Sequence, residues 1–518
     1  GILSREQLQL DAGAIREFYR DRGYLDAEVG RQIDLSPDQE DAVVTFTIDE
    51  GEQYTVGQIE LAGELMFPRD QIRLTMPLSP GDFFSAKKLD ASRQAVAGLY
   101  GRLGHVEANV RIEKVFHENE PKVDLRVTVQ PGRAYTVGKI EVRGNKQTKQ
   151  RVILRETRGM KPGRRFDGPG VQETRQRLNN TRLFKSSTIT LLGDEKDEVR
   201  DVLIEVEEAR TGSLSFGAGV SSDAGLVGQI NLRQRNFDLS DPPENFSELV
   251  TGQAFYGAGQ QFSLSLQPGS ERSRYSVSWR EPYLFQSDYS LDTSAFFFRR
   301  VRTDYDEERL GGNVGVGQRF GDVWTGQVNF RAEGVEIRDI DADAPRAVFA
   351  VEGDNALTAI GLSATRSTTD SPIFPSEGSR LQLGIERVGA LGGDFDFTKL
   401  TARYDKFWTV SEDFLGRKTV VSFRGQLGYI PEEDEAPIFE RFYAGGHSTF
   451  RGFALRGVGP RGVRNDTGTR SDEAVGGDFR LLVGLEYEFP LVEDWLRGVV
   501  FTDQGTVSDD ISLSKWRA

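Results

Sequence analysis

The sequence predicts two folds in succession: α+β repeats in the first 210 residues, then an all-β antiparallel transmembrane barrel. Three observations lead to this prediction. A short segment recurs after 81 residues in the N-terminal part. From Thr211 onward, apolar and polar residues alternate over stretches of about ten residues, which is typical of membrane barrels. One long segment, 431–476, interrupts the alternation and is rich in Gly and Arg.

Composition excludes several classes of protein and site. The chain has 518 residues, a net charge of −15 and no cysteine. The acidic balance argues against a nucleic-acid partner, because binding phosphates needs a basic surface. The lack of cysteine excludes disulfides, thiol catalysis and thiolate metal sites. No apolar run is long enough for a transmembrane helix, but a barrel strand needs only alternate apolar residues.

The repeat is clearest where Tyr54-Thr55-Val56-Gly57 returns as Tyr135-Thr136-Val137-Gly138. Periodicity within each copy predicts strand, helix, helix, strand, strand. In the second copy these elements are expected at 56–61, 68–75, 85–101, 106–115 and 123–129. A fixed period indicates a stacked array of one structural unit.

The repeat divides the chain into four expected domains: a partial unit at 1–50, whole units at 51–131 and 132–210, and a barrel at 211–518. The first copy begins at its second helix, near Arg5, so we expect truncation at the N-terminus. An exposed sheet edge in such a unit can accept an extended client segment by β-augmentation. The alternative is a rigid spacer, and the sequence does not separate the two.

The alternating part predicts thirteen strands. On the first, Leu214, Phe216 and Val220 alternate with small residues. A soluble sandwich also alternates, but its strands are usually shorter, and here aromatic residues gather at strand ends, as in interfacial girdles. Single-chain bacterial barrels have even strand numbers, so we expect the C-terminal strands to be missing. The predicted strands are 211–221, 225–236, 248–268, 272–285, 288–303, 306–319, 323–338, 354–369, 378–391, 395–411, 418–430, 477–490 and 496–507.

The long segment 431–476 is predicted to be a loop that carries Phe450-Arg451-Gly452-Phe453. Loops of this length are normally functional or disordered. An Arg between aromatic residues, with glycines that allow close approach, favours docking on a wall that offers a carboxylate. The alternative is a solvated loop. The sequence predicts no catalytic, metal or cofactor-binding residues, since His105, His117 and His447 lack ligand spacing and no nucleophile elbow occurs.

The repeats resemble POTRA (polypeptide-transport-associated) domains, and the whole chain resembles the outer-membrane protein assembly factors, which join such domains to a barrel. The most specific match is the loop motif Phe450-Arg451-Gly452-Phe453. Residues 137–145 resemble the first strand of the family's last POTRA domain. Residues 211–217 resemble its first barrel strand, and 374–380 a mid-barrel turn.

The resemblance implies a barrel of sixteen strands, of which about thirteen are present and the C-terminal ones are missing. It also implies that Arg451 docks inside the barrel on acidic wall residues. We therefore hypothesise that Arg451 pairs with Glu486 or Asp503; the alternative is separate solvated charges. The implied wall residues are Glu486, Phe501, Asp503 and Gly505, and the implied first-strand seam is Gly212, Leu214, Phe216, Gly217 and Gly219.

The function implied by the resemblance is an insertase for β-barrel proteins in the cell outer membrane, with the POTRA array in the periplasm. It would be no enzyme and need no cofactor. Implied partners are unfolded barrel clients, periplasmic chaperones, accessory outer-membrane lipoproteins and the lipid bilayer, with no nucleic acid. The alternatives are a TamA-like translocation factor and a two-partner secretion channel of the same architecture. A plain porin has no periplasmic array, and a barrel lipase would need a Ser–His pair on the wall.

Overall fold

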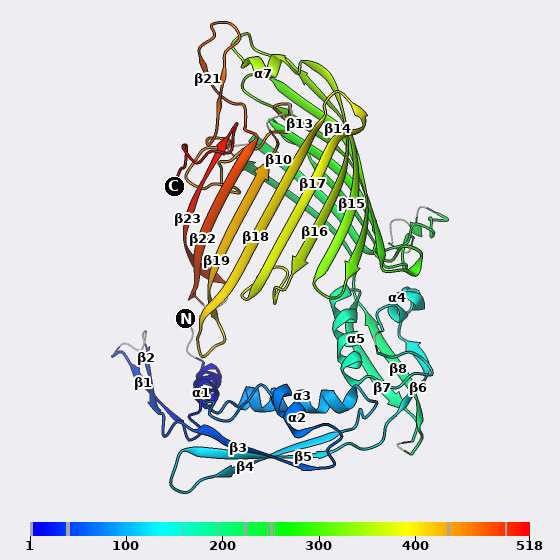
Figure 1. Ribbon diagram of the computed structural model, residues 1–518, viewed down its shortest axis with the longest axis vertical. Coiled ribbons are helices and arrows are strands. Elements are labelled where there is room, and N and C mark those ends of the chain that lie inside the picture. The colour runs from blue at the N-terminus through cyan, green and yellow to red at the C-terminus, as the bar shows by residue number, and fades with distance from the viewer. Residues whose placement is uncertain are drawn as a thin grey trace. The chain divides into compact units, whose positions relative to one another are not determined.

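A computed structural model describes residues 4–37, 42–157, 159–194, 196–221, 225–245, 247–248, 252, 254–431, 436–492 and 495–518 (Figure 1). The chain forms two compact units. One contains residues 1–209 with 412–417, and the other contains 210–411 with 418–518. Among the helices of the described residues, none is long and apolar enough to cross a membrane.

The first unit contains three repeats of helices and strands. The second and third repeats share one order of elements, and the first starts at its helix α1. The elements are α1 (Arg5–Arg20), β1 (Glu28–Leu35) and β2 (Ala42–Asp49); β3 (Thr55–Gly63), α2 (Arg69–Thr75), α3 (Ala86–Gly101), β4 (Asn109–Phe116) and β5 (Lys122–Gln130); and β6 (Thr136–Arg143), α4 (Gln150–Leu154), α5 (Gly168–Thr181), β7 (Phe184–Leu192) and β8 (Val199–Glu208). This confirms the predicted helices and strands of the second repeat.

Each whole repeat has its own hydrophobic core under a three-stranded sheet. The last strand of the repeat is central, so the orders are β3-β5-β4 and β6-β8-β7. In β5 every second side chain is buried, and these residues pack with Val96 and Tyr100 of α3. The hydroxyl of Ser85 accepts a hydrogen bond from the backbone N–H of Lys88 at 3.1 Å, which caps the start of α3. The outer strands of each sheet, such as β4, have one unpaired edge among the described residues.

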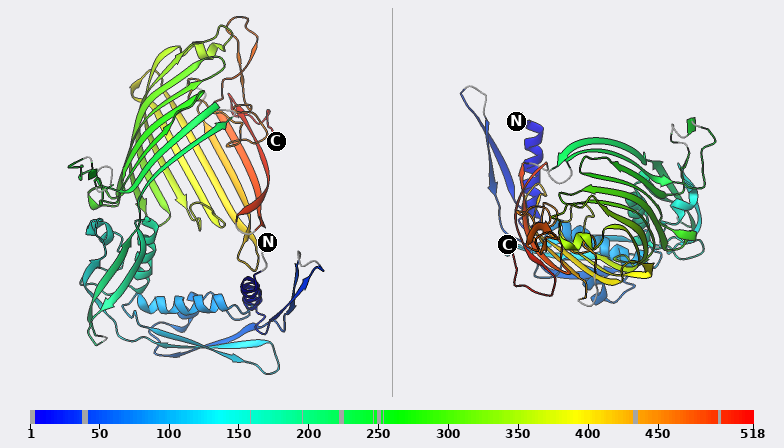
Figure 2. Two further views of the ribbon diagram at one scale, coloured as in Figure 1. Left: turned by 180° about the vertical axis from the view of Figure 1, so that it is seen from behind. Right: turned by 90° about the horizontal axis from the view of Figure 1, so that it is seen from above.

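The second unit is built on one antiparallel sheet of thirteen described strands, β9 to β19 with β22 and β23. Neighbours in sequence are neighbours in the sheet, except that β19 pairs with β22. The sheet curls, as Figure 2 shows from above. Its strands are β9 (Gly212–Ser221), β10 (Gly225–Phe237), β11 (Gln260–Gln267), β12 (Arg272–Glu281), β13 (Tyr289–Val301), β14 (Asp306–Phe320), β15 (Trp324–Arg338), β16 (Gly353–Ser367), β17 (Gly378–Gly393), β18 (Phe397–Glu412), β19 (Lys418–Tyr429), β22 (Phe479–Val492) and β23 (Leu496–Ser508).

Most predicted strands are confirmed, but the observed bounds of two are shorter than predicted. Residues 249–251 and 253 of the strand expected at 248–268 lie outside the described residues, and β11 begins at Gln260. Before it, Gly257 and Gly259 have φ of +115° and +70°, which an extended strand cannot accommodate. The strand expected at 272–285 ends at Glu281, because Pro282 has no N–H for the ladder and a 3-10 turn follows (η1, Leu284–Gln286).

On the curled sheet the apolar side chains are exposed and the charged ones are buried, which is the reverse of a soluble protein. On β15, Val328 and Phe330 are 38% and 41% exposed. The charged side chains of Arg331 and Glu333, on the other face of the same strand, are only 16% and 2% exposed. At the edge of the sheet Phe216 is 72% exposed. An apolar outer face with buried charges inside is the arrangement expected of a sheet that faces lipid.

The long loop between β19 and β22 packs on the inner face of the sheet. It contributes Ile438, Phe439 and Phe442 to a core that also contains Val335 of β15 and Phe397 of β18. Contrary to the expectation of little strand structure, the loop contains a short hairpin of β20 (Arg461–Val463) and β21 (Arg470–Ala474). A short helix, α7 (Arg346–Phe349), lies in the connection between β15 and β16.

Candidate functional site

The loop motif Phe450-Arg451-Gly452-Phe453 is held by an apolar cluster. Phe450 is 1% exposed and packs with Leu482 of β22 and Val507 of β23. The ring of Phe453 lies against that of Phe450, with 4.8 Å between centroids. Gly452 between them has a φ of +85°, which reverses the chain at low cost only with glycine. The motif is therefore packed on the last two described strands of the sheet.

Arg451 uses its whole side chain to bind these strands. Its Nε and Nη2 donate to the two carboxylate oxygens of Asp503, both at 2.7 Å, and its backbone N–H donates to Oδ2 at 3.0 Å. Its Nη1 lies 2.7 Å from Oε1 of Glu486. The guanidinium also covers the ring of Phe501, 3.6 Å from its centroid. A bidentate pair with stacking requires the planar fork of Arg and is stronger than a single-point ion pair.

The register of β22 and β23 explains why these residues meet. Glu486 lies directly opposite Phe501, and Gly484 lies opposite Asp503. A Cβ at Gly484 would stand 3.1 Å from Oδ1 of Asp503, so glycine leaves room for the carboxylate. At Gly505 a Cβ would lie 2.3 Å from the carbonyl oxygen of Leu481, so close strand packing requires glycine there as well. The predicted loop motif thus contacts three of the predicted wall residues, Glu486, Phe501 and Asp503, and the fourth, Gly505, allows β22 and β23 to pack closely.

The predicted first-strand residues lie elsewhere. All are on β9, which forms the opposite edge of the sheet from β23. Leu214 and Phe216 are exposed. Gly217 and Gly219 leave open space: a Cβ at Gly217 first meets Gln229 at 3.9 Å, and at Gly219 it meets nothing within 4 Å. Gly212 begins the strand opposite Gln234 of β10.

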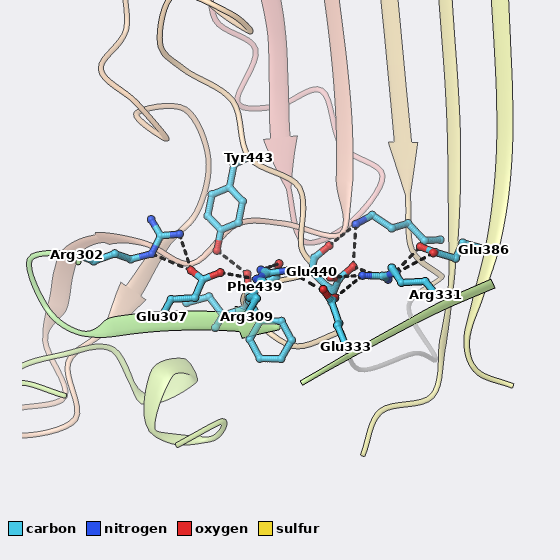
Figure 3. Close-up of polar contacts among 11 residues, drawn as sticks. Arg302, Glu307, Arg309, Arg331, Glu333, Glu386, Phe439, Glu440 and Tyr443 are labelled. Atoms are coloured by element: carbon cyan, nitrogen blue, oxygen red, sulfur yellow. Dashed lines mark hydrogen bonds and ion pairs between the residues drawn. The ribbon is translucent and has the colours of Figure 1, made fainter. Parts of the chain in front are cut away.

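The structure also shows a second set of loop contacts, which sequence reasoning missed (Figure 3). The carboxylate of Glu440 lies among three cations of the sheet, and its side chain is 5% exposed. Its Oε1 is 3.3 Å from Nη1 of Arg309 and 3.0 Å from Nη1 of Arg331. Its Oε2 is 3.3 Å from Nζ of Lys399. The loop is therefore bound to β14, β15 and β18 as well as to β22 and β23.

Backbone contacts strengthen this second attachment. Arg309 donates to the carbonyl oxygen of Phe439 at 2.7 Å, and Lys399 donates to that of Glu440 at 2.8 Å. The hydroxyl of Tyr443 donates to the carbonyl oxygen of Ile438 at 2.7 Å, which stiffens this part of the loop. The remaining wall residues of the network are Arg302, Glu307, Glu333 and Glu386.

The mid-barrel turn between β16 and β17 is held by one carboxylate. Asp370 accepts hydrogen bonds from the backbone N–H groups of Ser371, Ser376 and Glu377, at 3.0, 2.9 and 3.1 Å, and from the hydroxyl of Ser376. Desolvation works against the charged form of Asp370. The hydrogen bonds from Ser376 and Glu377, with the nearby ammonium of Lys418, outweigh it and lower the pKa to about 2.

The described residues contain no group of three or more His, Cys, Asp or Glu placed to hold a metal ion. His105 instead contacts the carbonyl oxygen of Gly132 at 3.1 Å, and His117 contacts Asp124 at 3.0 Å. Both contacts join residues within the first unit.

Two family models match the chain. The Omp85 superfamily domain matches residues 254–517. POTRA, described as the surface antigen variable number repeat, matches residues 1–51, 54–132 and 135–209. The three POTRA matches fall on the three repeats of the first unit.

Several relatives carry the name outer membrane protein assembly factor BamA. That of Nitratidesulfovibrio vulgaris is 26% identical over 527 aligned residues, which cover 100% of this chain and 62% of the relative. That of Neisseria meningitidis is 24% identical and covers 98% of this chain and 64% of the relative. The chain thus spans less than two thirds of their length.

A solved structure shows the same fold. It is BamA from Haemophilus ducreyi lacking POTRA domains 1–3, which aligns with a TM-score of 0.60 at 19% identity and covers 88% of this chain and 87% of its own. With the superfamily model matching just over half of the residues, and the POTRA model most of the rest, this chain belongs to the Omp85 superfamily.

Proposed function

We propose that this chain acts in the outer membrane to fold and insert β-barrel proteins, with its POTRA repeats in the periplasm. The names of its BamA relatives and its membership of the Omp85 superfamily support this proposal. The apolar outer face of the sheet, with charges buried inside, supports a membrane location. The work proposed is assembly without bond making, so no catalytic residue or cofactor is needed.

The observation that carries the proposal is the position of β9 at one edge of the described sheet. Among the described residues β9 pairs only with β10, so the N–H and C=O groups of its other edge have no strand partner. Such an edge can template an incoming strand. Gly217 and Gly219 remove side chains that would stiffen this edge. We propose that the terminal strand of an unfolded client adds here, next to the lipid-facing surface.

The POTRA sheets offer a second kind of edge. β4 of the second repeat and β7 of the third are outer strands with one unpaired side among the described residues. Extended client segments, delivered by periplasmic chaperones, can pair with these strands before they reach β9. Accessory outer-membrane lipoproteins are further proposed partners. The loop motif, fixed on β22 and β23 through Arg451, would keep these two strands in position while β9 is engaged.

The test is cross-linking during insertion, with the full protein reconstituted in lipid vesicles. Because the chain has no cysteine, one introduced thiol is a unique probe. Ser215→Cys on β9 should form a disulfide with a cysteine in the terminal strand of a client that is being inserted. Ser294→Cys, in the interior strand β13, is the matched control and should not. Insertion without a cross-link at β9 would overturn the templating step. Export of a soluble client, with no barrel insertion, would favour the two-partner secretion or TamA-like alternatives.

A further inference from the structure

Glu440 joins parts of the sheet that are not neighbours. Its carboxylate contacts Arg331 of β15 and Lys399 of β18, and β16 and β17 lie between these strands. Neighbouring strands are about 4.8 Å apart, so β15 and β18 are separated by about 14 Å along the sheet. The long side chains of Arg331 and Lys399 cover this separation and meet at one carboxylate. Glu440, a loop residue, therefore links β14, β15 and β18 across the concave face.

Without Glu440, the positive charges in this network outnumber the negative ones. The sheet and its adjoining turn supply four cations to the network but only three carboxylates, Glu307, Glu333 and Glu386. Glu440 supplies the fourth negative charge. The two oxygen contacts of the Lys399 ammonium in the described part of the chain are both to Glu440. Removing one member of a buried ionic pair is costly because the other is left uncompensated, so the sheet favours a loop that brings a carboxylate here.

The second attachment lies on another part of the sheet. Arg451, eleven residues further along the chain, binds Asp503 of β23 and Glu486 of β22. Each attachment has its own apolar cluster. Ala436, Ile438 and Phe439 belong to the cluster on β15 to β18, whereas Ala444 and Phe450 belong to the cluster on β22 and β23.

We infer that the loop is a brace with two separate anchors, and that Glu440 is the positioning residue that fixes it to β14, β15 and β18. The brace ties the curved wall to the last described strands and holds the curvature between them. This role does not depend on the proposed insertase function. It predicts that either anchor can be released while the other stays closed.

Two buried alanines allow each anchor to be followed by itself. Ala436 and Ala444 are 3% and 1% exposed, one in each cluster, and cysteine is close to alanine in size. In the full protein reconstituted in lipid vesicles, the rate at which a maleimide labels Ala436→Cys reports opening at the Glu440 anchor. The rate at Ala444→Cys reports opening at the Arg451 anchor.

Glu440→Gln should raise labelling at position 436 by about tenfold or more and leave position 444 within about twofold, because loss of a buried charge opens its own surroundings. Asp503→Asn should raise labelling at position 444 by about tenfold or more and leave position 436 within about twofold. Lys399→Met removes a partner of Glu440 on the sheet and leaves the sequence of the loop unchanged. It therefore tests the same anchor if Glu440→Gln folds poorly. Glu386→Gln is the matched control: Glu386 also binds Arg331, at 3.1 Å, but belongs to β17, so labelling at 436 should not change.

Three results would overturn the inference. Unchanged labelling at 436 in both Glu440→Gln and Lys399→Met would show that the charges do not hold the loop. An equal rise in Glu386→Gln would show that the network only stabilises the wall. A rise at both cysteines in every variant would show one cooperative unit rather than two anchors.

Discussion

Arg451 and Asp503 meet edge to edge: two guanidinium nitrogens bind the two carboxylate oxygens at 2.7 Å, and the backbone N–H of Arg451 adds a third bond. Glu486 receives a single contact from the same guanidinium. The two acidic residues therefore differ in how much they hold the loop. Asp503 orients it, whereas Glu486 mainly adds charge.

A double-mutant cycle measures that difference. Arg451→Ala combined with Asp503→Ala should show a coupling of about 1–3 kcal/mol in the free energy of unfolding. The cycle with Glu486→Ala should give a smaller coupling, since one hydrogen bond is lost instead of a fork. Urea unfolding in lipid vesicles provides the free energies. Equal couplings, or none in either cycle, would contradict the assigned geometry. Arg451→Lys should recover only part of the coupling because lysine cannot make the fork.

Two glycines of the site should respond differently to alanine. At Gly505 the new Cβ would lie 2.3 Å from the carbonyl oxygen of Leu481, so β22 and β23 must separate. At Gly452 a Cβ meets nothing within 4 Å, and the cost is only that of a positive φ, about 1 kcal/mol. We expect Gly505→Ala to impair folding and Gly452→Ala to lower the free energy of unfolding slightly. Heat-induced mobility shifts on gels compare the two, and a milder effect at Gly505 would refute this packing.

How far the sequence predicts the fold depends on the kind of residue involved. The strands of the sheet were predicted because outward residues such as Leu383 and Ile385 alternate with polar ones, and this signal is local. Residues 254–259 also include apolar ones, but Gly257 and Gly259 have positive φ, and Asp241 accepts the backbone N–H of Tyr256, so this stretch forms no regular strand. Alternation alone does not contain that information.

The same distinction applies to the site. The loop motif and its partners were predicted because they form short patterns within the chain. The Glu440 network was not, because its members come from six separate segments and each charge by itself looks like a residue of the polar face. A buried carboxylate in a loop gives no local pattern. The one available signal was the excess of cations on inward positions of β14, β15 and β18.

The mid-barrel turn should lose its order in acid. The folded pKa of Asp370 is about 2, below the ordinary value of about 3.9. The carboxylate therefore stabilises the turn fully above about pH 4, and this contribution is lost as the pH falls through 2. Hydrogen exchange at the amides of Ser376 and Glu377 should be about tenfold slower in the wild type than in Asp370→Asn at pH 6. The difference should shrink as the pH falls through 2 and be lost near about pH 1, and a full difference that persists there would show that the charge is not its cause.

Substituting two glycines of β9 tests whether the flexibility of this edge strand is used during insertion. A Cβ at Gly217 or Gly219 meets no atom closer than 3.9 Å, and valine favours extended backbone by up to about 1 kcal/mol. If β9 must yield and re-pair during insertion, Gly217→Val and Gly219→Val should fold normally but insert a barrel client several-fold more slowly. Gly311→Val in β14 is a contrasting variant, because its Cβ would lie 2.5 Å from Cβ of Glu333 and should disturb folding itself. Unchanged insertion rates in both β9 variants, with normal folding, would mean that the flexibility of this edge is not used.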